Sequence, residues 1–299
     1  EESGCVGEGT AWRPQPLLLY RDENPNPVAA APAYLKLDST GEYIFDYGWA
    51  DAHQRMLGSS YYPKLQIAVP FTPVPGPRLL LHPTLAQEAR REVASALLSG
   101  CVELVRKGEL SSAHLTFCRP DESEIARTES NFLPRLGEQY HWFNEGYTDF
   151  EHFLESLASR KRKAIRRERK LANSHPLSIH TVHGDEATSE QWDVFFRMYR
   201  ATAEKKWGRP YLNREFFHLL GQRLGRKVVL FLVRREPEGR WVAGAWNLRG
   251  TQALFGRNWG CLESFAMLHF EVCYYRAIEY AISAGLARVE AGAPGLYKI

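Results

Sequence analysis

The last third of the chain places its secondary-structure elements in an order that few folds share. Three runs of strand-forming residues, 227–235, 241–249 and 251–257, are separated only by short turns at Pro237 and Gly250. Turns this short join antiparallel neighbours, so the runs predict a meander. A long helix at 265–283, a stop at Ala284-Gly285 and a strand near 289–292 are expected to follow. This order predicts an α/β fold built on mostly antiparallel sheets flanked by helices.

The helix expected at 265–283 carries an acidic residue on its apolar side. On a helical wheel with His269 at zero, the apolar residues fill an arc from about 80° to 240°, and Glu271 falls inside it at about 200°. An ionised carboxylate is rarely buried without a partner, because its desolvation is costly. Glu271 therefore either forms a structural ion pair with an arginine, for which Arg257 is the nearest candidate, or has a raised pKa and exchanges protons.

The first half of the chain shows a similar order of elements, which predicts two domains at residues 1–146 and 147–299. The boundary is expected where Gly146 follows a strand at 140–143 and Thr148 caps a helix over 149–173. The first domain is expected to contain strands at 16–20, 28–36, 41–49, 64–70 and 113–118, and a helix at 85–107 with Thr84 as its N-cap.

A basic segment dominates the charge of the molecule. Residues 160–170 hold eight Lys or Arg and one Glu, a local charge of +7, although the whole chain carries only +3. A run of charges is most often a solvated helix face. Like charges at this density repel one another, however, and are seldom retained without an anionic partner. The segment therefore predicts a phosphate-binding helix in which Lys163, Arg166 and Arg167 contact the ligand.

Composition excludes several classes of protein. Five cysteines and ten histidines show none of the short repeats that bind metals, and reduced thiols indicate a cytoplasmic protein without a metal site. No stretch reaches the roughly 18 apolar residues of a membrane span. The chain starts at Glu1 and its final strand has barely ended at Ile299, so we expect it to be a fragment.

Several longer motifs resemble one bacterial family, the FemAB-like N-acyltransferases of the GNAT superfamily, over essentially the whole chain. The family is related to the Fem-type aminoacyltransferases that build peptidoglycan cross-bridges. The motifs are Tyr61-Tyr62-Pro63-Lys64-Leu65, Ser159-Arg160-Lys161-Arg162-Lys163-Ala164-Ile165-Arg166-Arg167-Glu168, Lys206-Trp207-Gly208-Arg209-Pro210-Tyr211, Gly256-Arg257-Asn258-Trp259-Gly260 and His269-Phe270-Glu271-Val272-Cys273-Tyr274-Tyr275.

The resemblance implies two GNAT-like lobes with a cleft between them, whose meeting face carries Tyr61, Tyr62 and Arg257. It also implies transfer of an acyl group to an amine without a covalent enzyme intermediate. The donor is an aminoacyl-tRNA in the Fem branch and an acyl-CoA in ordinary GNAT enzymes. The acceptor is a small amine or a peptidoglycan precursor.

Two segments depart from the family pattern. The usual GNAT phosphate loop has no clean match, and Pro75-Gly76-Pro77-Arg78 only approximates it. Such a loop presents backbone N–H groups to a pyrophosphate, so its absence weakens the case for CoA. The segment Glu290-Ala291-Gly292-Ala293-Pro294-Gly295-Leu296-Tyr297-Lys298 lacks three polar positions that the family usually has.

Direct aminolysis needs a base, donors for the developing oxyanion and an anion site for the carrier. Glu271 is the candidate base, with Glu290 second. Arg257 and Asn258 either orient the acyl carbonyl or cap the next helix. The remaining candidates are His269 for catalysis, and Lys163, Arg166, Arg167, Arg78, Tyr61, Tyr62, Trp207, Trp259 and Tyr275 for binding. The rival class is a non-catalytic RNA- or polyanion-binding protein that keeps the acyltransferase fold.

Overall fold

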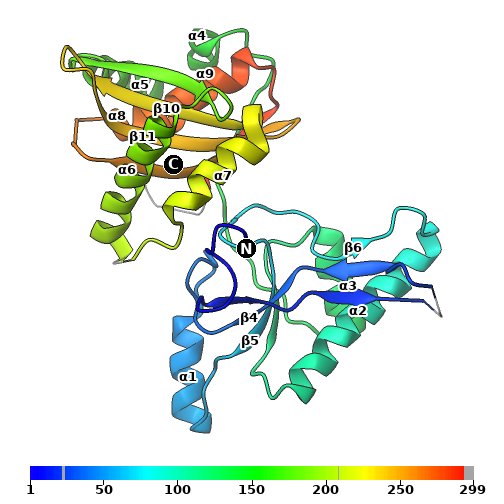
Figure 1. Ribbon diagram of the computed structural model, residues 1–299. Coiled ribbons are helices and arrows are strands. Elements are labelled where there is room, and N and C mark those ends of the chain that lie inside the picture. Colours follow the sequence, from blue (N-terminus) through cyan, green and yellow to red (C-terminus); the bar gives the residue numbers. More distant parts are fainter. Residues whose placement is uncertain (22–23, 208, 293–299) are drawn as a thin grey trace. The chain divides into compact units, whose positions relative to one another are not determined.

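The computed structural model describes residues 1–21, 24–207 and 209–292, with only the backbone of residues 206 and 207. The chain forms two compact units, Glu1–Gly137 and Glu138–Ile299. Each unit has its own sheet and its own hydrophobic core (Figure 1). The sequence-based fold class, α/β with mostly antiparallel sheets flanked by helices, is confirmed.

The first unit contains two small sheets. One has the order β1 (Trp12–Pro14), β4 (Ala33–Lys36), β5 (Lys64–Ile67) and β7 (Ala113–Leu115), in which only the β5–β7 pair is parallel. The other has the order β2 (Leu17–Leu19), β3 (Ala29–Ala31) and β6 (Leu80–Leu81). The helices are α1 (Tyr47–Leu57), α2 (Gln87–Lys107) and α3 (Pro120–Ser130).

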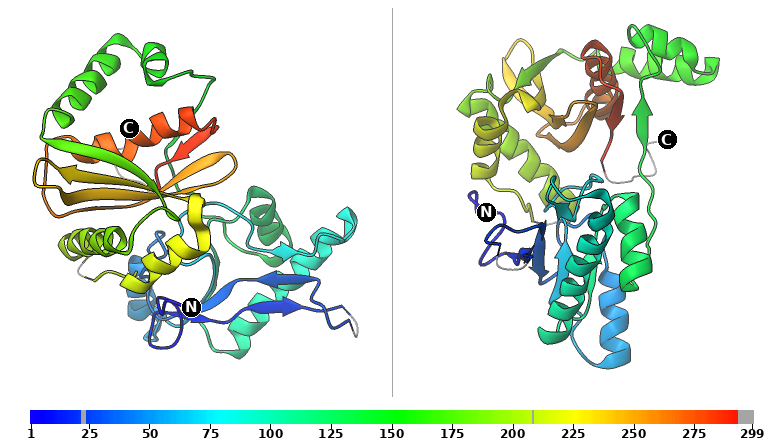
Figure 2. Two further views of the ribbon diagram at one scale, coloured as in Figure 1. Left: turned by 45° about the horizontal axis from the view of Figure 1, so that its top comes forward. Right: turned by 90° about the vertical axis from the view of Figure 1, so that its right-hand side faces the viewer.

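The four-stranded sheet of this unit has one apolar and one polar face. Side chains alternate along a strand, so Leu65 and Ile67 of β5 lie on one face, where they join a core with Leu98 of α2. Helices α2 and α3 lie side by side there (Figure 2). The opposite face carries Lys64 and Gln66, and it is buried as well. The buried face of a sheet usually carries apolar side chains. When polar side chains are buried instead, they need hydrogen-bond or ion-pair partners within the protein.

The second unit is built on one six-stranded sheet. Its order is β8 (His141–Phe143), β13 (Arg288–Glu290), β12 (Ala253–Cys261), β11 (Arg240–Arg249), β10 (Val228–Arg235) and β9 (Leu177–His183), and only β12 and β13 are parallel neighbours. The helices are α4 (Phe150–Ser156), α5 (Ser159–Ala172), α6 (Ser189–Trp207), α7 (Arg214–Leu224), the 3₁₀ turn η1 (Gly225–Lys227), α8 (Leu268–Phe270), the π-helical segment η2 (Glu271–Tyr275) and α9 (Arg276–Ser283).

Helices cover both faces of this sheet (Figure 2). Phe231 of β10 faces the core formed with η2 and α9, which includes Val272 and Ala281. Helices α6 and α7 cover the opposite face, where Phe217 packs edge-on to Trp246 at a ring separation of 6.3 Å. At Gly260 a Cβ atom would lie 2.5 Å from the backbone of α6, so glycine is required for this close approach.

The unit boundary differs from the sequence-based expectation. The second unit begins at Glu138, whereas the sequence placed the boundary after residue 146. The reason is the short strand β8, which pairs antiparallel with β13 in the second sheet. Three residues are too few to reveal by pattern alone which sheet they will join.

Several expected elements are also wrong in detail. Residues 41–49 form no strand, because Gly41 and Tyr43 have positive φ, and α1 begins at Tyr47. The expected helix over 149–173 is broken at Leu157 and Ala158, whose extended ψ angles of 151° and 141° separate α4 from α5. Asp149 caps α4 in place of Thr148, and Ala86 precedes α2 in place of Thr84. The strand expected at 251–257 is β12, which begins at Ala253 and continues to Cys261.

Candidate active site

Glu271 lies at the centre of an ion-pair network in the second unit. Its side chain is 0% exposed, as the helical wheel predicts. Arg169 of α5 donates from Nε to Oε2 at 3.0 Å and from Nη2 to Oε1 at 2.9 Å. The Arg276 guanidinium lies 2.9 Å from Oε1, and Glu279 accepts from Arg169 at 2.8 Å. Two arginines thus compensate two acids, of which Glu271 is buried and Glu279 is partly exposed.

The partner of Glu271 was therefore predicted incorrectly. Arg257 lies over the Trp246 ring at 5.7 Å, and the partner is instead Arg169 of the basic segment, which turns inward. Burial alone would lower the pKa of Arg169, but its hydrogen bonds to Glu271 and Glu279 outweigh this effect and raise it. The ring of Phe150 lies 4.3 Å from the same guanidinium, a cation–π contact that adds to the network.

The network sits on the π-helical segment η2. One wider turn of this kind re-aims the side chains that follow and is frequent at functional sites. Tyr275 ends the segment and donates its hydroxyl proton to Glu168 of α5. Burial raises the pKa of Tyr275, and the carboxylate of Glu168 raises it further. Tyr275 is thus a buried donor that fastens α5, not an exposed binding residue.

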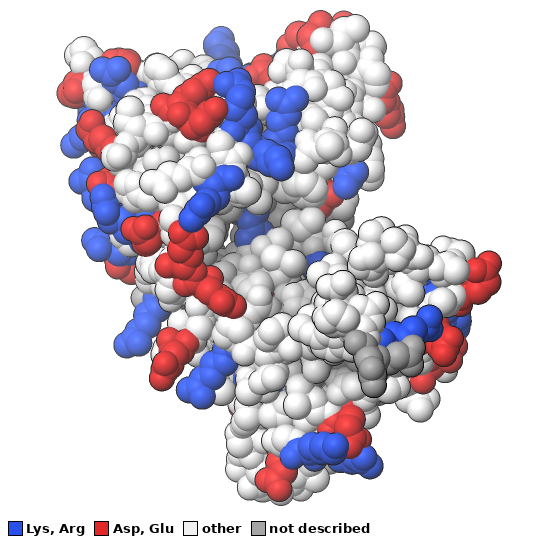
Figure 3. Space-filling view, turned by 45° about the vertical axis from the view of Figure 1, so that its right-hand side comes forward, with Lys and Arg blue, Asp and Glu red and all other residues white. Residues whose placement is uncertain are grey.

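The outer face of α5 remains charged and exposed. Lys163, Arg166 and Arg167 are all exposed, and Arg166 donates to Glu151 at 2.6 Å. Among the described residues, no acid forms an ion pair with Lys163 or Arg167. The face of the second unit seen in Figure 3 carries acidic and basic side chains close together, whereas residues 160–170 hold eight Lys or Arg and one Glu. The expectation that this helix presents cations to solvent agrees with its geometry.

The end of β12 carries the remaining candidates of this unit. Asn258 is buried, and its Oδ1 accepts from the Trp246 indole N–H at 3.1 Å. His269 packs its ring against Trp259 at 5.4 Å and against Tyr274 at 5.8 Å. Neither Asn258 nor His269 shares the Glu271 network. The side chain of Trp207, another candidate, lies outside the described residues.

Glu290 differs from Glu271 in having an unused oxygen. It ends β13, directly beside Phe255 of β12, and is 5% exposed. Its Oε1 accepts from Arg288 at 2.8 Å, whereas no described residue donates a hydrogen bond to Oε2, and His141 Nε2 is 3.8 Å from it. A buried oxygen without a donor is costly in a folded protein, so it marks a place where a ligand or water binds.

Parallel pairing between β12 and β13 ends at this residue. The next residue of β12, Gly256, would place a Cβ 3.3 Å from the Glu290 carbonyl oxygen, so glycine permits the two backbones to lie close together. The described pairing of β12 with β13 covers Ala253–Phe255, so the Glu290 carboxylate stands at the point where this pairing ends.

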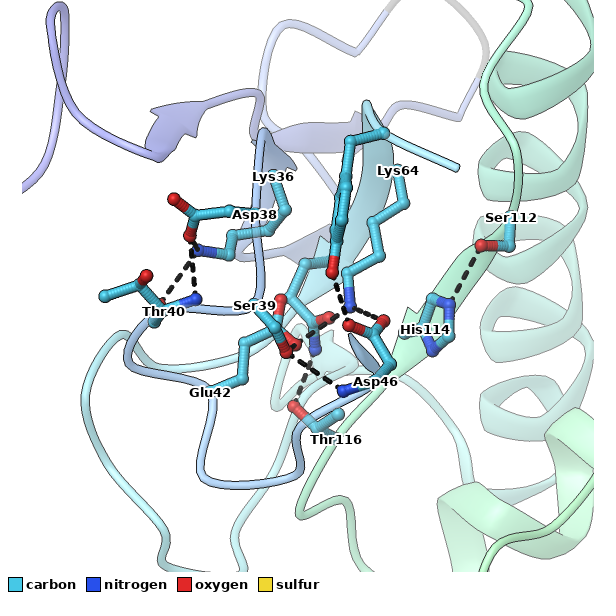
Figure 4. Close-up of polar contacts among 12 residues, drawn as sticks. Lys36, Asp38, Ser39, Thr40, Glu42, Asp46, Lys64, Ser112, His114 and Thr116 are labelled. Carbon is cyan, nitrogen blue, oxygen red and sulfur yellow. Dashed lines mark hydrogen bonds and ion pairs between the residues drawn. The ribbon is translucent and has the colours of Figure 1, made fainter. Parts of the chain in front are cut away.

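Tyr61 and Tyr62 belong to a separate buried cluster in the first unit. Lys64 extends between Glu42 and Asp46, with Nζ 2.8 Å from Glu42 Oε2 (Figure 4). Tyr62 donates to Asp46 Oδ1 at 2.7 Å, and Tyr61 lies 3.1 Å from His114 Nε2. Burial raises the pKa of Tyr61 to about 12.

One further lysine, Lys36, and one histidine, His114, lie beside this cluster. Lys36 is fully buried, donates to the Thr40 carbonyl at 3.0 Å and lies 4.0 Å from the Trp12 ring centre. Burial lowers the pKa of Lys36 to about 8 and that of His114 to about 4. Burial also raises the pKa of Glu42, whereas for Asp46 the effect of burial is outweighed by bonds from Lys64 and Tyr62, so its pKa is lowered.

This cluster was missed at the sequence level. Alternating polar and apolar residues predict an ordinary strand with one face exposed to solvent. This pattern occurs in Lys64–Leu65–Gln66–Ile67 and in the neighbouring Tyr34–Leu35–Lys36. The only available signal was that two lysines share the polar face of adjacent strands, which the register Lys36↔Lys64 brings opposite one another. Two positive charges directly opposite one another on adjacent strands repel, so acidic side chains from another part of the chain must compensate them.

Arg78 is buried and has no room for a phosphate group in this arrangement. Its guanidinium donates to the carbonyls of Thr116 and Val74, both at 2.9 Å, and to Pro77 at 3.2 Å. Burial lowers the pKa of Arg78. It holds the proline-rich segment 70–78 in place, so the phosphate-loop interpretation of 75–78 finds no geometric support.

The described part of the chain contains no group of three or more His, Cys, Asp or Glu placed to hold a metal ion. None of its helices combines the length and apolar character needed to span a membrane.

Comparison with known proteins identifies the family. No curated protein matches the chain in sequence. Among solved structures, FemX is similar with a TM-score of 0.52 and 13% identity, over 95% of this chain and 80% of that one. L-PGS from Bacillus licheniformis gives 0.51 and 10%, over 79% of this chain and 66% of that one. A tandem GNAT protein from the clavulanic acid pathway gives 0.44 and 12%, over 94% and 74%.

At these identities the solved structures establish the fold. The FemAB-like family model, described as peptidoglycan biosynthesis/recognition, matches residues 1–299. The chain therefore belongs to the FemAB-like family and is an acyltransferase of that family, as its sequence predicts.

Proposed function

We propose that the protein transfers an aminoacyl group from an aminoacyl-tRNA to an amine of a peptidoglycan precursor, with Glu290 of the second unit as the general base. The amine nitrogen attacks the ester carbonyl carbon and forms the new amide bond. The bond from that carbon to the tRNA oxygen breaks, Glu290 accepts the proton of the amine, and a proton is returned to the leaving oxygen.

The unused oxygen of Glu290 supports this assignment. A base must offer a free lone pair to the proton it removes, and Oε2 is a buried acceptor without a described donor. The half-buried imidazole of His141, 3.8 Å away, connects Oε2 to the surface of the unit.

Glu271 is less suited to this role. Arg169 engages both of its oxygens, and Arg276 lies against one of them. Both oxygens are therefore occupied by cationic donors, whereas a base must offer a free lone pair to the proton it removes. We assign Glu271 to holding α5 on η2, and the proposal that it is itself the base becomes the alternative in the experiment below.

The exposed cations of α5 favour an RNA carrier over CoA. Eight Lys or Arg within residues 160–170 exceed what the few phosphates of CoA require, even after Arg169 turns inward. A tRNA acceptor arm offers many phosphates along its backbone. Arg78, the residue expected to approximate a phosphate loop, donates to backbone carbonyls instead.

The experiment compares donors and bases in one assay. Purified protein is incubated with labelled aminoacyl-tRNA or with acyl-CoA and an amine-bearing peptidoglycan precursor. We expect transfer from the RNA donor, and we expect Glu290→Gln to lower turnover by roughly a hundredfold or more while the fold is retained. Glu103→Gln, a change on the surface of α2 in the first unit, is the matched control.

Three outcomes contradict parts of the proposal. Transfer from acyl-CoA alone would reject the RNA donor. Undiminished turnover in Glu290→Gln, together with a loss in a folded Glu271→Gln protein, would return the base to Glu271. Salt-sensitive RNA binding without transfer from either donor would identify the protein as a non-catalytic polyanion-binding member of its fold.

A further inference from the structure

We infer that Phe45 and Tyr47 of the first unit form a stacking platform for the sugar ring of the acceptor. The inference rests on the proposed function, because a peptidoglycan-type acceptor joins a sugar to an amine-bearing peptide. It adds a binding site in the first unit, whereas the reacting groups proposed above belong to the second.

The two rings are parallel and open to solvent. Their centres are 5.7 Å apart and their planes differ by 11°. Each residue is 52% exposed, although aromatic side chains of this size usually bury most of their surface. The rings are therefore offset-stacked on one another, and the flat face that this stack turns to solvent is a surface that a ring-shaped ligand can cover.

The residue between them is fixed in the protein interior. Asp46 is 1% exposed. Its backbone N–H donates to Ser39 Oγ at 3.1 Å, and its carboxylate accepts from Tyr62 and Lys64. Phe45 and Tyr47 are the immediate neighbours of Asp46 in the chain, so the hydrogen bonds of Asp46 also restrict their backbone positions. The platform is therefore preorganised, which reduces the entropy lost when a ligand binds.

The local charge favours an uncharged ring. The charged Asp, Glu, Lys and Arg residues within 43–57 are Asp46, whose carboxylate pairs with Lys64, Asp51 and Arg55, so this segment carries no excess of positive charge. A nucleic-acid site needs a positive surround as well as aromatic rings. The densest run of cations in this chain lies instead on α5 of the second unit, with eight Lys or Arg in residues 160–170. A pyranose presents an apolar C–H face that lies flat on the negative face of an aromatic ring, so a sugar fits this surface better than a nucleotide.

Trp49 provides an internal comparison. It is 61% exposed and lies on the same helix, two residues after Tyr47. At 100° per residue it is rotated by about 200° from Tyr47, and its ring faces the Arg135 guanidinium at 5.8 Å. If ligands bound α1 through non-specific apolar contact, Trp49 would contribute at least as much as Phe45 and Tyr47. If they bind the platform, Trp49 contributes nothing.

The test measures binding by titration calorimetry with three probes: N-acetylmuramyl pentapeptide, the same pentapeptide without sugar, and a single-stranded RNA. The double variant Phe45→Leu/Tyr47→Leu keeps apolar bulk but removes the flat faces. We expect it to bind the muramyl peptide about tenfold more weakly than the wild type. We expect unchanged affinity for the free pentapeptide, and no change for any probe in Trp49→Leu.

Equal affinity of wild type and double variant for the muramyl peptide would overturn the inference. So would an equal loss for the sugar-free peptide, or a loss confined to RNA, which would indicate nucleotide stacking. Thermal melting of both variants separates loss of binding from unfolding, and Phe45→Leu alone serves if the double variant melts early. Wild-type transfer is measured in parallel: binding through the platform without transfer rejects the proposed function and leaves the platform standing.

Discussion

Arg169 and Glu271 are joined by two parallel hydrogen bonds although they are 102 residues apart in the chain. The planar guanidinium matches the two carboxylate oxygens, so this contact fixes orientation as well as distance. It connects the basic helix α5 to η2 in the core of the second unit. The same helix that presents Lys163 and Arg167 to solvent is therefore held from its inner side by a buried acid.

Replacing Arg169 by methionine should destabilise the protein by roughly 3–5 kcal/mol, because the carboxylate of Glu271 would lose its bidentate partner while remaining buried. Urea unfolding of the variant measures this change. Arg166→Met is the matched control: its partner Glu151 is exposed, so its loss should cost less than about 1 kcal/mol. Equal effects of the two changes would show that the buried pair contributes no more than a surface pair.

Replacing Lys163, Arg166 and Arg167 by alanine should weaken RNA binding and flatten its dependence on salt. Each cation that neutralises a phosphate releases condensed counterions, so the slope of log affinity against log salt should fall by roughly one per residue removed. Filter binding at several salt concentrations measures the slope. Changing Arg106 and Lys107, which pair with Glu103 on α2, should leave it unaltered. An unaltered slope in the triple variant would make α5 only a solvated face.

Lys36 should make the protein more stable as the pH rises from about 8 to 10.5. Burial lowers its pKa in the folded state to about 8 from an ordinary 10.5. Between these values the unfolded chain binds a proton that the folded chain does not, so the free energy of unfolding rises with pH, by up to about 1.4 kcal/mol per unit. Urea unfolding across this range measures the slope. Lys36→Met should reduce it, and an identical slope in that variant would contradict the assignment.

Gly41→Ala should destabilise the loop that covers the polar face of the first sheet. Gly41 has φ of +76°, and an added Cβ would lie 2.4 Å from the Phe71 ring, so both backbone strain and overlap oppose alanine. A loss of roughly 1–3 kcal/mol is expected by urea unfolding. Gly48→Ala is the control: nothing lies within 4 Å of its added Cβ, and alanine is the better helix former in α1. A neutral Gly41→Ala would show that this loop adapts.

The sequence predicts the meander, the closing helix and the burial of Glu271, because each depends on local periodicity. It does not predict the partner of Glu271. That choice depends on the break at Leu157 and Ala158, which turns α5 so that Arg169 faces inward while its neighbours stay outside. Once α5 is known to begin at Ser159, a helical wheel places Arg169 beside Ile165 and Ala172 on the less exposed side. The break that sets this start is not visible in the local pattern.

The cluster around Lys64 was hidden for a different reason. Alternating polar residues on a strand normally indicate solvent on that face. Here residues 39–46 cover the face and supply Glu42 and Asp46, which compensate the lysine. Nothing local to β4 or β5 reveals that a loop will fold over them. Glu290 could be named as a candidate from its motif, but its unused oxygen depends on the pairing of β13 with β12 and β8.

The position of Asp46 has a consequence for the dynamics of α1. Asp46 occupies the N-cap of that helix, yet its side chain makes no capping hydrogen bond and accepts from Lys64 and Tyr62 instead. None of the residues of α1 is buried, and its contacts with the interior include Asp46 at its start and the packing of the His53 ring against the buried Tyr61 ring at 5.6 Å. We therefore expect the amide protons of α1 to exchange with solvent faster when the contact between Asp46 and Lys64 is lost. Hydrogen exchange in this surface helix would then depend on the protonation of the buried Asp46 and Lys64 side chains.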